Sequence, residues 1–333
     1  METSQFVLAS RPYGMASPDN FRFEKTNLDD LKDNEVLLKS WYVSVDPYMR
    51  GRMNDAKSYV EAFQLAQPIK GSIVAKVLES KSEKIKAGDI VVGTLPWAEF
   101  SVESGDKLQK IESTNIPPYY YLGILGMPGL TAFIGMHDIC KPVKGETVVI
   151  SGAAGAVGLI AGQIAKIMGA KVIGIAGSDE KCNILKEKFG FDEVINYKTS
   201  KSIRKDLGKL CPEGVNAYFD NVGGTITEGV VANFNLHARF ALCGQISQYN
   251  NSRLPEGNLV MAWLLTKNVT LQGFIVRNYT DRFEVALAQL NKWLIDGKLK
   301  YTETIIHGFD KLPEAFLSLF SGGNKGKMLV EIE

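Results

Sequence analysis

The sequence predicts an α/β protein in which a β-rich region is followed by a doubly wound parallel sheet. Three observations carry this prediction. Short strands separated by turns fill the chain to about Leu122, and from about Met127 helices alternate with strands, which is typical of a parallel sheet covered on both faces. In addition, residues Thr147–Gly158 run from a buried strand through a glycine-rich turn into a helix.

The β-rich region is defined by short apolar runs bounded by turn residues. They predict strands at Glu35–Lys39, Gly71–Val77 and Gly88–Gly93. From Gly297 the chain returns to short strands and an amphipathic helix. We expect this last segment to rejoin the first region.

The parallel sheet needs further strands after the glycine turn. Apolar runs predict them at Asp192–Tyr197, Asn216–Asp220, Phe240–Gly244 and Val269–Phe274. The intervening helices are expected at Asp179–Phe189, Ile226–Asn235 and Asp281–Asp296.

The glycine turn indicates a dinucleotide site. It leads into an apolar helix over Leu159–Met168, and Lys171–Ala176 forms a second buried strand, which completes one βαβ unit. The glycines allow a tight turn and a close approach of the backbone to phosphate, and the free N–H groups at the helix start point at the anion. A small-residue packing device is the alternative interpretation of the turn alone.

The end of the second strand favours NADPH over NADH. An NAD-binding domain carries an acidic residue there, but this chain has Gly177, followed by Ser178 and Lys181. A 2′-phosphate would have room and would meet a hydroxyl and a positive charge. In the alternative interpretation, Asp179 and Glu180 only complement the dipole of the next helix and Lys181 is solvated, which leaves NAD open.

Composition excludes several classes of function. The 333 residues carry a net charge of +1, with 45% hydrophobic and 23% charged residues, so no basic surface for nucleic acid or anionic lipid is expected. The start of the chain lacks the features of a secretory signal, and no run of about 20 apolar residues predicts a membrane span. We therefore expect a cytoplasmic protein.

Metal chemistry is not expected either. The four cysteines lie far apart without a Cys-x-x-Cys pair, and the three histidines, His137, His237 and His307, are isolated. This distribution argues against a zinc site and against a nucleophilic triad.

Several motifs together resemble one known family. They are Ser44–Met53 (SVDPYMRGRM), Pro128–Ala132, the glycine turn, Gly177–Lys181, Asp220–Gly224, Gly244–Asn250 and Gly323–Lys327. This set is similar to the medium-chain dehydrogenase/reductase superfamily, and within it to the zinc-independent, NADPH-dependent alkenal, double-bond and prostaglandin reductases of the leukotriene dehydrogenase-like branch. Zinc-dependent members carry a catalytic cysteine, a Gly-His-Glu and a four-cysteine lobe, whereas this chain has no cysteine or histidine before His137.

The resemblance implies an architecture. A GroES-like catalytic domain would comprise residues 1–125 with 297–333, and a Rossmann domain with strand order 3-2-1-4-5-6 would comprise residues 126–296. The cofactor would bind in the cleft between them, and the protein would be a homodimer.

The resemblance also implies site residues. It places Gly155, Ala156 and Val157 at the pyrophosphate of NADPH. Around the adenosine 2′-phosphate it places Ser178, Lys181 and Tyr197, close to Gly177. Asn221 would lie near the ribose and pyrophosphate, and the nicotinamide half would be bordered by Cys243, Phe274, Val276 and Asn324.

The implied reaction is reduction of an activated C=C bond of an α,β-unsaturated aldehyde or ketone. Hydride goes to the β-carbon, so the protein has to stabilise the enolate and supply a proton. Without metal or a suitable histidine, a tyrosine hydroxyl is the expected donor, and the candidates are Tyr249, Tyr59 and Tyr48. The cofactor ribose hydroxyl and water are rival proton donors, and each tyrosine could instead be only an aromatic wall.

Other residues and functions stay open from the sequence. Arg50 and Met127 are expected to line the substrate site with the three tyrosines, although Arg50 and Arg52 could equally form surface ion pairs. The nearest alternative function is a zinc-free NADPH:quinone reductase. A non-catalytic NADPH-binding protein is the alternative from a different class.

Overall fold

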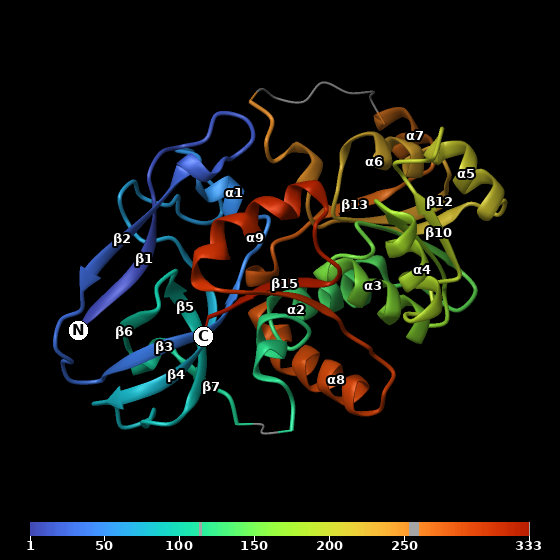
Figure 1. The fold of residues 1–333 in the computed structure, drawn as a ribbon. Coiled ribbons are helices and arrows are strands. Elements are labelled where there is room, and N and C mark those ends of the chain that lie inside the picture. The colour runs from blue at the N-terminus through green and yellow to red at the C-terminus, as the bar shows by residue number, and fades with distance from the viewer. Residues whose placement is uncertain (113–114, 253–259, 333) are drawn as a thin grey trace.

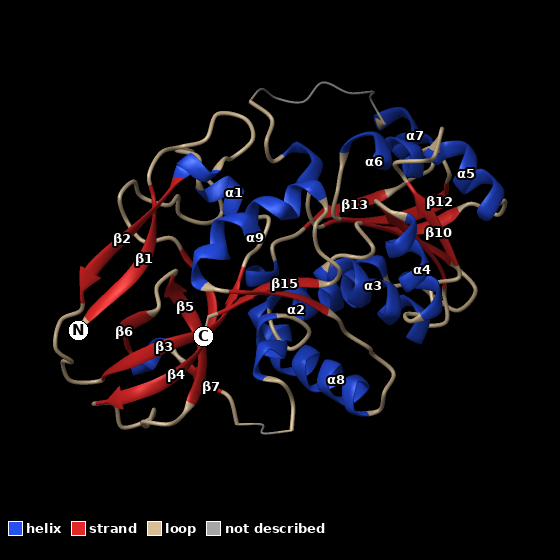
Figure 2. Cartoon of the chain, viewed as in Figure 1, coloured by secondary structure: helices blue, strands red, loops and turns tan. Residues whose placement is uncertain are grey.

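The structure is a computed structural model that describes residues 1–112, 115–252 and 260–332. Two large sheets organise the molecule. Figures 1 and 2 show a β-rich half on the left and a half on the right in which helices flank a second sheet. Strand β15 (Lys327–Glu331) runs across the middle, between the two halves (Figure 1). The mixed α/β architecture predicted from the sequence is confirmed.

The β-rich half contains a seven-stranded sheet with the order β14-β15-β3-β4-β5-β7, and β6 pairs with β3. The strands are β3 (Glu35–Ser44), β4 (Lys70–Ser80), β5 (Ile90–Pro96), β6 (Phe100–Ser104), β7 (Gln109–Lys110), β14 (Glu303–His307) and β15. Strands β1 (Glu2–Leu8) and β2 (Phe21–Asn27) form a separate hairpin, and the helices are α1 (Met49–Arg52) and α9 (Leu312–Ser318).

The end of the chain belongs to this sheet. Strand β15 pairs antiparallel with β3, with Leu329 opposite Ser44, and parallel with β14. The last strands therefore complete the sheet that the first residues begin, as expected for a segment that rejoins the first region. The boundaries at residues 125/126 and 296/297 stay a prediction.

The second half is built on six parallel strands in the order β10-β9-β8-β11-β12-β13, which is the predicted order 3-2-1-4-5-6. The strands are β8 (Thr147–Ser151), β9 (Lys171–Ala176), β10 (Glu193–Asn196), β11 (Val215–Asp220), β12 (Phe234–Leu242) and β13 (Thr270–Gly273). The helices are α2 (Met127–Phe133), α3 (Ala156–Ile167), α4 (Asp179–Glu187), α5 (Ile203–Leu210), α6 (Gly224–Val231), α7 (Met261–Thr266) and α8 (Phe283–Ile295).

Short 3₁₀ helices lie at Pro18–Asn20, Gly105–Lys107, Pro118–Leu122, Ile246–Gln248, Val276–Arg282, Phe309–Lys311 and Leu319–Ser321, and Ile134–Cys140 is a π-helix that continues α2.

Strand β8 shows why this sheet is covered on both faces. Successive side chains of a strand point to opposite faces, and Val148, Val149 and Ile150 are all fully buried. Val148 and Ile150 pack in a core with residues of α2, α3 and α8, whereas Val149 packs in another with residues of α5 and α6. A side chain at Gly158 would overlap the carbonyl of Gly152, so glycine there lets the start of α3 sit close to the turn.

The region around β12 differs most from the sequence prediction. The predicted helix Ile226–Asn235 ends at Val231, and β12 begins at Phe234 rather than Phe240. A bulge separates the β11 partners Phe234 and Arg239, and His237 inside it has a φ of 61°. This irregularity breaks the apolar alternation that sequence reasoning uses. Helix α5 was not predicted; its signal is Ser202, whose hydroxyl caps it by accepting the N–H of Lys205 at 3.3 Å.

The two chain crossings between the halves are packed together. Tyr301, on the return crossing, fills the space beside Gly123, on the outgoing one, where any side chain would overlap its hydroxyl. Gln163 of α3 holds the return crossing, because its amide exchanges two hydrogen bonds of 2.8 Å with the backbone of Lys300. These contacts hold together the two segments that connect the halves, a region that we call the hinge.

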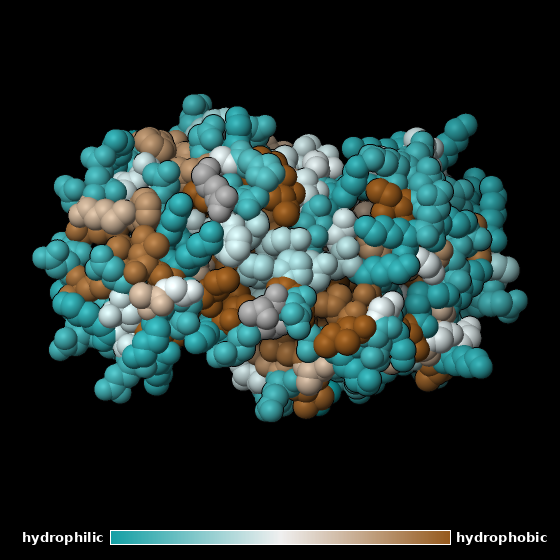
Figure 3. Space-filling view, turned by 60° about the horizontal axis from the view of Figure 1, so that its bottom comes forward, coloured by the Kyte–Doolittle hydropathy of each residue, from teal (hydrophilic) through white to brown (hydrophobic). Residues whose placement is uncertain are grey.

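Polar and charged residues cover most of the face shown in Figure 3, with apolar residues in scattered patches. Among the residues that the structure describes, no helix combines the length and apolar character needed to cross a bilayer.

Candidate active site

The glycine turn has the geometry of a phosphate site. Gly152 has a φ of 57°, which favours glycine, and its carbonyl accepts the N–H of Gly155 at 2.9 Å. Gly155 caps α3, which begins at Ala156, so the first N–H groups of the helix, including that of Val157, have no partner within it. These residues fit the pyrophosphate of a dinucleotide.

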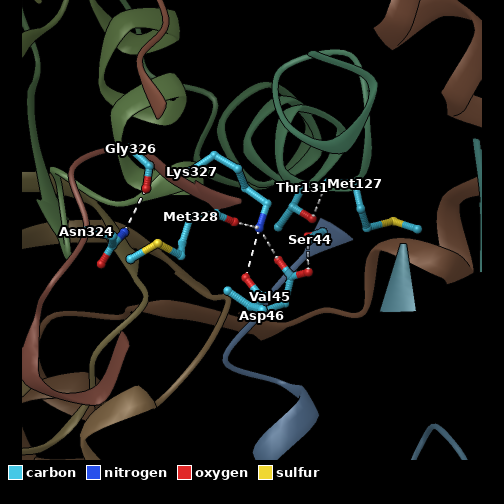
Figure 4. Close-up of polar contacts among 9 residues, drawn as sticks. All are labelled: Ser44, Val45, Asp46, Met127, Thr131, Asn324, Gly326, Lys327 and Met328. Atoms are coloured by element: carbon cyan, nitrogen blue, oxygen red, sulfur yellow. Dashed lines mark hydrogen bonds and ion pairs between the residues drawn. The ribbon is translucent and has the colours of Figure 1, made fainter. Parts of the chain in front are cut away.

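A segment from the end of the chain lies against this turn. The N–H of Gly326 donates to the carbonyl of Ala154 at 2.8 Å, and the side-chain amide of Asn324 donates to Gly326 at 2.7 Å (Figure 4). A side chain at Gly326 would overlap the carbonyl of Thr302. Asn324 is thereby held beside the glycine turn, although it lies about 170 residues away in the sequence.

Asn221 is held at the end of β11 by Ser151. Its N–H donates to the Ser151 hydroxyl and its side-chain amide to the Ser151 carbonyl, both at 2.8 Å. The fully buried Asp220 carboxylate accepts the Ser151 hydroxyl at 2.6 Å and the N–H groups of Val222 and Gly223 at 3.0 Å. Sequence reasoning placed Asp220 at the end of a strand and in the Asp220–Gly224 motif but gave it no role.

The residues expected at the adenosine end do come together. The position of a side chain at Gly177 would lie 3.0 Å from the Tyr197 hydroxyl. Ser178 caps α4 by accepting the N–H of Lys181 at 3.2 Å, and the Lys181 ammonium donates to the carbonyl of Gly322 at 2.9 Å. Burial, and then the charges of neighbouring lysines, lower the pKa of Lys181.

Both interpretations of this segment describe part of the geometry. Asp179 and Glu180 lie in the first turn of α4, as the dipole interpretation held. Each has another partner, because Asp179 accepts the amide of Asn196 at 2.7 Å and Glu180 pairs with Lys325. Neither interaction removes the positive charge of Lys181, which stays available to a phosphate.

The three candidate tyrosines share one electrostatic neighbourhood. Tyr249 follows a 3₁₀ helix and accepts the N–H of Gln245 on its hydroxyl at 3.3 Å. Burial raises the pKa of Tyr249, and charge interactions link it to Tyr59 and Cys243. Burial also raises the pKa of Tyr48, which interacts with Tyr59 in turn. At neutral pH all three are proton donors rather than phenolates.

Tyr59 is 58% exposed, yet the protein atoms around its hydroxyl raise its pKa. Solvent therefore reaches part of the side chain, while protein atoms surround the rest of it. Arg277, which sequence reasoning missed, interacts with both Tyr59 and Tyr48. Since Arg277 follows Val276 in the second half, residues of both halves act on these tyrosines.

Arg50 corrects the sequence analysis. Only 2% of it is exposed, and its guanidinium donates to Asn250, Asn54 and the carbonyl of Gly14 at 2.6–2.9 Å. It therefore does not line the substrate site, and it ties the residue after Tyr249 to the first half. Burial and partners on other segments explain the error, because neither shows in the local motif.

Cys243, Phe274, Val276 and Met127 remain from the sequence analysis. Cys243 has its pKa raised to about 12 by burial, so it stays a thiol and packs, as expected. Phe274 is buried against Phe219, and Val276 begins a 3₁₀ helix. Met127 is 38% exposed at the start of α2 (Figure 4).

A buried ion pair holds the segment that carries Tyr48. Lys327 is 1% exposed, and its ammonium donates to Asp46 and to the carbonyl of Val45 at 2.9 Å (Figure 4). The other carboxylate oxygen of Asp46 accepts the hydroxyl of Ser44. Sequence reasoning missed this pair, which connects β15 to the Tyr48 turn.

No group of three or more metal-ligating side chains occurs within residues 1–112, 115–252 and 260–332.

Comparisons with known proteins cover nearly the whole chain. Residues 4–111 match a family described as the N-terminal domain of oxidoreductase, and residues 156–292 match one described as zinc-binding dehydrogenase. A putative NADP-dependent oxidoreductase of Bacillus subtilis is 52% identical over 98% of this chain and 97% of its own. A 2-alkenal reductase (NADP⁺-dependent) of Nicotiana tabacum is 45% identical over 90% of this chain and 88% of its own.

A solved structure is also similar over its full length. CurA from Vibrio vulnificus in complex with NADPH has a TM-score of 0.95 and 40% identity, with 99% of both chains covered. The cofactor of that complex is the one that the glycine turn and Lys181 predicted here.

Proposed function

Since the chain belongs to the zinc-independent branch of the medium-chain dehydrogenase/reductase superfamily and is an NADP-dependent oxidoreductase, we propose that it reduces the C=C bond of α,β-unsaturated aldehydes and ketones. The alkenal reductase relative supports this substrate class. The observation that carries it is the cluster of protonated tyrosines, Tyr48, Tyr59 and Tyr249, in which Tyr59 interacts with the other two and with Arg277 of the second half.

Bound NADPH supplies the hydride that adds to the β-carbon of the substrate. The task of the protein is then to stabilise the negative charge on the carbonyl oxygen. Tyr249 suits this task, because its hydroxyl oxygen accepts the Gln245 N–H and its own proton stays free to donate to the substrate. The same N–H stabilises the phenolate if that proton moves.

The hydride and one proton together saturate the double bond. Tyr59 of the first half is a second donor, since its ring is exposed and it interacts with Tyr249. The α-carbon takes its proton from a tyrosine, from the cofactor ribose hydroxyl or from water. Cys243 takes no part as a base because its thiol is protonated at neutral pH.

The experiment compares nonenal with a naphthoquinone by NADPH oxidation, with the nonenal product identified as saturated aldehyde or as unsaturated alcohol. We expect the saturated aldehyde and a higher kcat/KM for nonenal. Faster reduction of the quinone would favour the zinc-free quinone reductase instead. No turnover of either class would favour an NADPH-binding protein with another role.

Tyr249→Phe tests the proposed role of this residue. Loss of an oxyanion donor lowers kcat by about 10²-fold, whereas NADPH affinity should change little. Tyr13→Phe is a matched control, because Tyr13 is 85% exposed and outside the tyrosine cluster. If the two variants have the same kcat, Tyr249 only lines the cleft.

We also propose a homodimer. Strand β13 lies at the end of the parallel sheet, and Leu271 on it and Met261 and Leu265 on α7 are exposed. In the described part of the chain no strand pairs with the outer edge of β13, and such an edge beside exposed apolar side chains favours pairing with a second copy. Light scattering should give twice the chain mass, and Leu265→Glu should lower it. A cytoplasmic location stays a prediction.

A further inference from the structure

The segment Gly322–Gly326, which leads into β15, contacts the start of α4 in the other half. The Lys181 ammonium donates to the Gly322 carbonyl, and Lys325 pairs with Glu180. Gly326 bonds to Ala154 of the glycine turn. The segment therefore spans the cofactor site from the pyrophosphate end to the adenosine end.

Three ammonium groups gather at this contact. The charges of Lys198 and Lys325 both act on Lys181. Within residues 1–112, 115–252 and 260–332, only Lys325 of the three has a carboxylate partner, Glu180. The three lysines and Glu180 together carry a net charge of about +2. This charge complements that of a phosphate monoester, which is about −1.5 to −2 at neutral pH.

The cluster lies where the 2′-phosphate of NADPH is expected. Lys198 follows Tyr197, whose hydroxyl borders Gly177, and Lys181 is in the first turns of α4. Lys181 and Lys198 come from the nucleotide-binding half. Lys325 comes from the segment that leads into the sheet of the other half, and sequence reasoning gave it no role although the Gly323–Lys327 motif contains it.

We propose that Lys325 binds the 2′-phosphate of NADPH across the boundary between the two halves. On binding, Lys325 exchanges the Glu180 carboxylate for the phosphate, and Lys181 exchanges the Gly322 carbonyl for it. NADPH therefore ties Gly322–Gly326 to α4 through its phosphate, and NADH does not. The inference concerns cofactor recognition and does not depend on which substrate is reduced.

The ion pair between Glu180 and Lys325 predicts opposite changes in NADPH affinity when either residue is replaced. The Glu180 and Lys325 side chains are 65% and 43% exposed, so their ion pair adds little stability. Glu180 competes with the phosphate for Lys325. Removing Glu180 should therefore tighten NADPH binding, whereas removing Lys325 should weaken it. A purely structural pair would lose the same interaction in both variants.

The test titrates NADPH and NADH, by fluorescence, into Lys325→Met, Lys325→Arg and Glu180→Gln. We expect Lys325→Met to weaken NADPH by about tenfold and leave NADH unchanged, Lys325→Arg to retain affinity, and Glu180→Gln to tighten NADPH by a few fold. Lys186→Met is the control, because Lys186 on α4 pairs with Glu193 instead. Equal weakening of both cofactors, or no effect of Lys325→Met, would overturn the proposal.

A second measurement reads the contact itself. Adenosine 2′,5′-bisphosphate should protect the amides of Gly322–Gly326 from hydrogen exchange, and 5′-AMP should not. In Lys325→Met this protection should disappear while the variant stays folded. Protection that is the same for both nucleotides would refute the bridge, since only one of them carries the 2′-phosphate.

Discussion

Glu303→Gln should make the stability of the protein less dependent on pH. Glu303 begins β14 near the hinge, and one of its carboxylate oxygens is buried without a hydrogen-bond partner in the described part of the chain. The neighbouring Tyr301 hydroxyl is buried without a partner in the described part of the chain as well, and burial, followed by the Glu303 charge, raises its pKa. Burial raises the pKa of Glu303 to about 7, from 4.5.

This pKa shift determines how the free energy of unfolding changes with pH. The folded protein holds the Glu303 proton more tightly than the unfolded chain, so the free energy of unfolding falls as pH rises from about 4.5 to 7. At about 1.36 kcal/mol per pH unit, the full shift is worth ~3 kcal/mol, and solvent at the partly exposed carboxylate reduces this to about 1–3 kcal/mol. Glutamine imitates the protonated acid and does not ionise.

Urea unfolding at pH 5 and pH 8 measures the effect. The free energy of unfolding of Glu303→Gln should exceed that of the wild type by only a minor part of this shift at pH 5, just above the unfolded pKa, and by about 1–3 kcal/mol at pH 8. Glu187→Gln, on the exposed side of α4, is the control. A difference between Glu303→Gln and the wild type that is the same at both pH values would refute the assignment of an ionising, partly buried carboxyl.

Three further variants test the site and its support. Lys181→Ala should weaken NADPH by about 1.5–3 kcal/mol, or roughly 10- to 150-fold, without weakening NADH in a fluorescence titration, and equal losses would argue against a 2′-phosphate contact. Arg50→Met leaves three acceptors without their donor, at about 1–3 kcal/mol each when fully buried, and should lower the urea midpoint far more than Arg52→Met; similar midpoints would contradict this. Gly326→Ala should weaken NADPH and NADH alike, because its side chain would overlap the Thr302 carbonyl and displace the segment that bonds to Ala154, and calorimetry showing unchanged affinities would count against this contact.

The fold was predictable because its signals are local. Buried strands such as Val148–Ile150 and helices such as α3 show their periodicity within a dozen residues, and the glycine turn marks the junction between them. The strand order came from the family resemblance rather than from the pattern itself. Local patterns fail at the bulge that contains His237. The left-handed conformation of this residue interrupts the apolar pattern, so the first half of β12 was not predicted.

The site was only partly predictable, because some side chains take their roles from distant partners. Lys327 looks like a surface lysine in its motif, but the pairing of β15 with β3 buries it beside Asp46. Arg50 looks like a substrate ligand until Asn250, 200 positions later, accepts its hydrogen bond. Such contacts arise from tertiary packing, which local patterns do not contain.

The central position of β15 has a consequence for synthesis on the ribosome. It occupies the edge of β3 at Tyr42–Ser44, yet it is made almost 300 residues later. The parallel-sheet half is continuous in sequence and can fold as a unit while translation proceeds. The first sheet has to wait, with part of an apolar strand edge open, until Lys327–Glu331 emerge. Nascent chains stalled shortly before Lys327 should therefore aggregate more readily than complete ones.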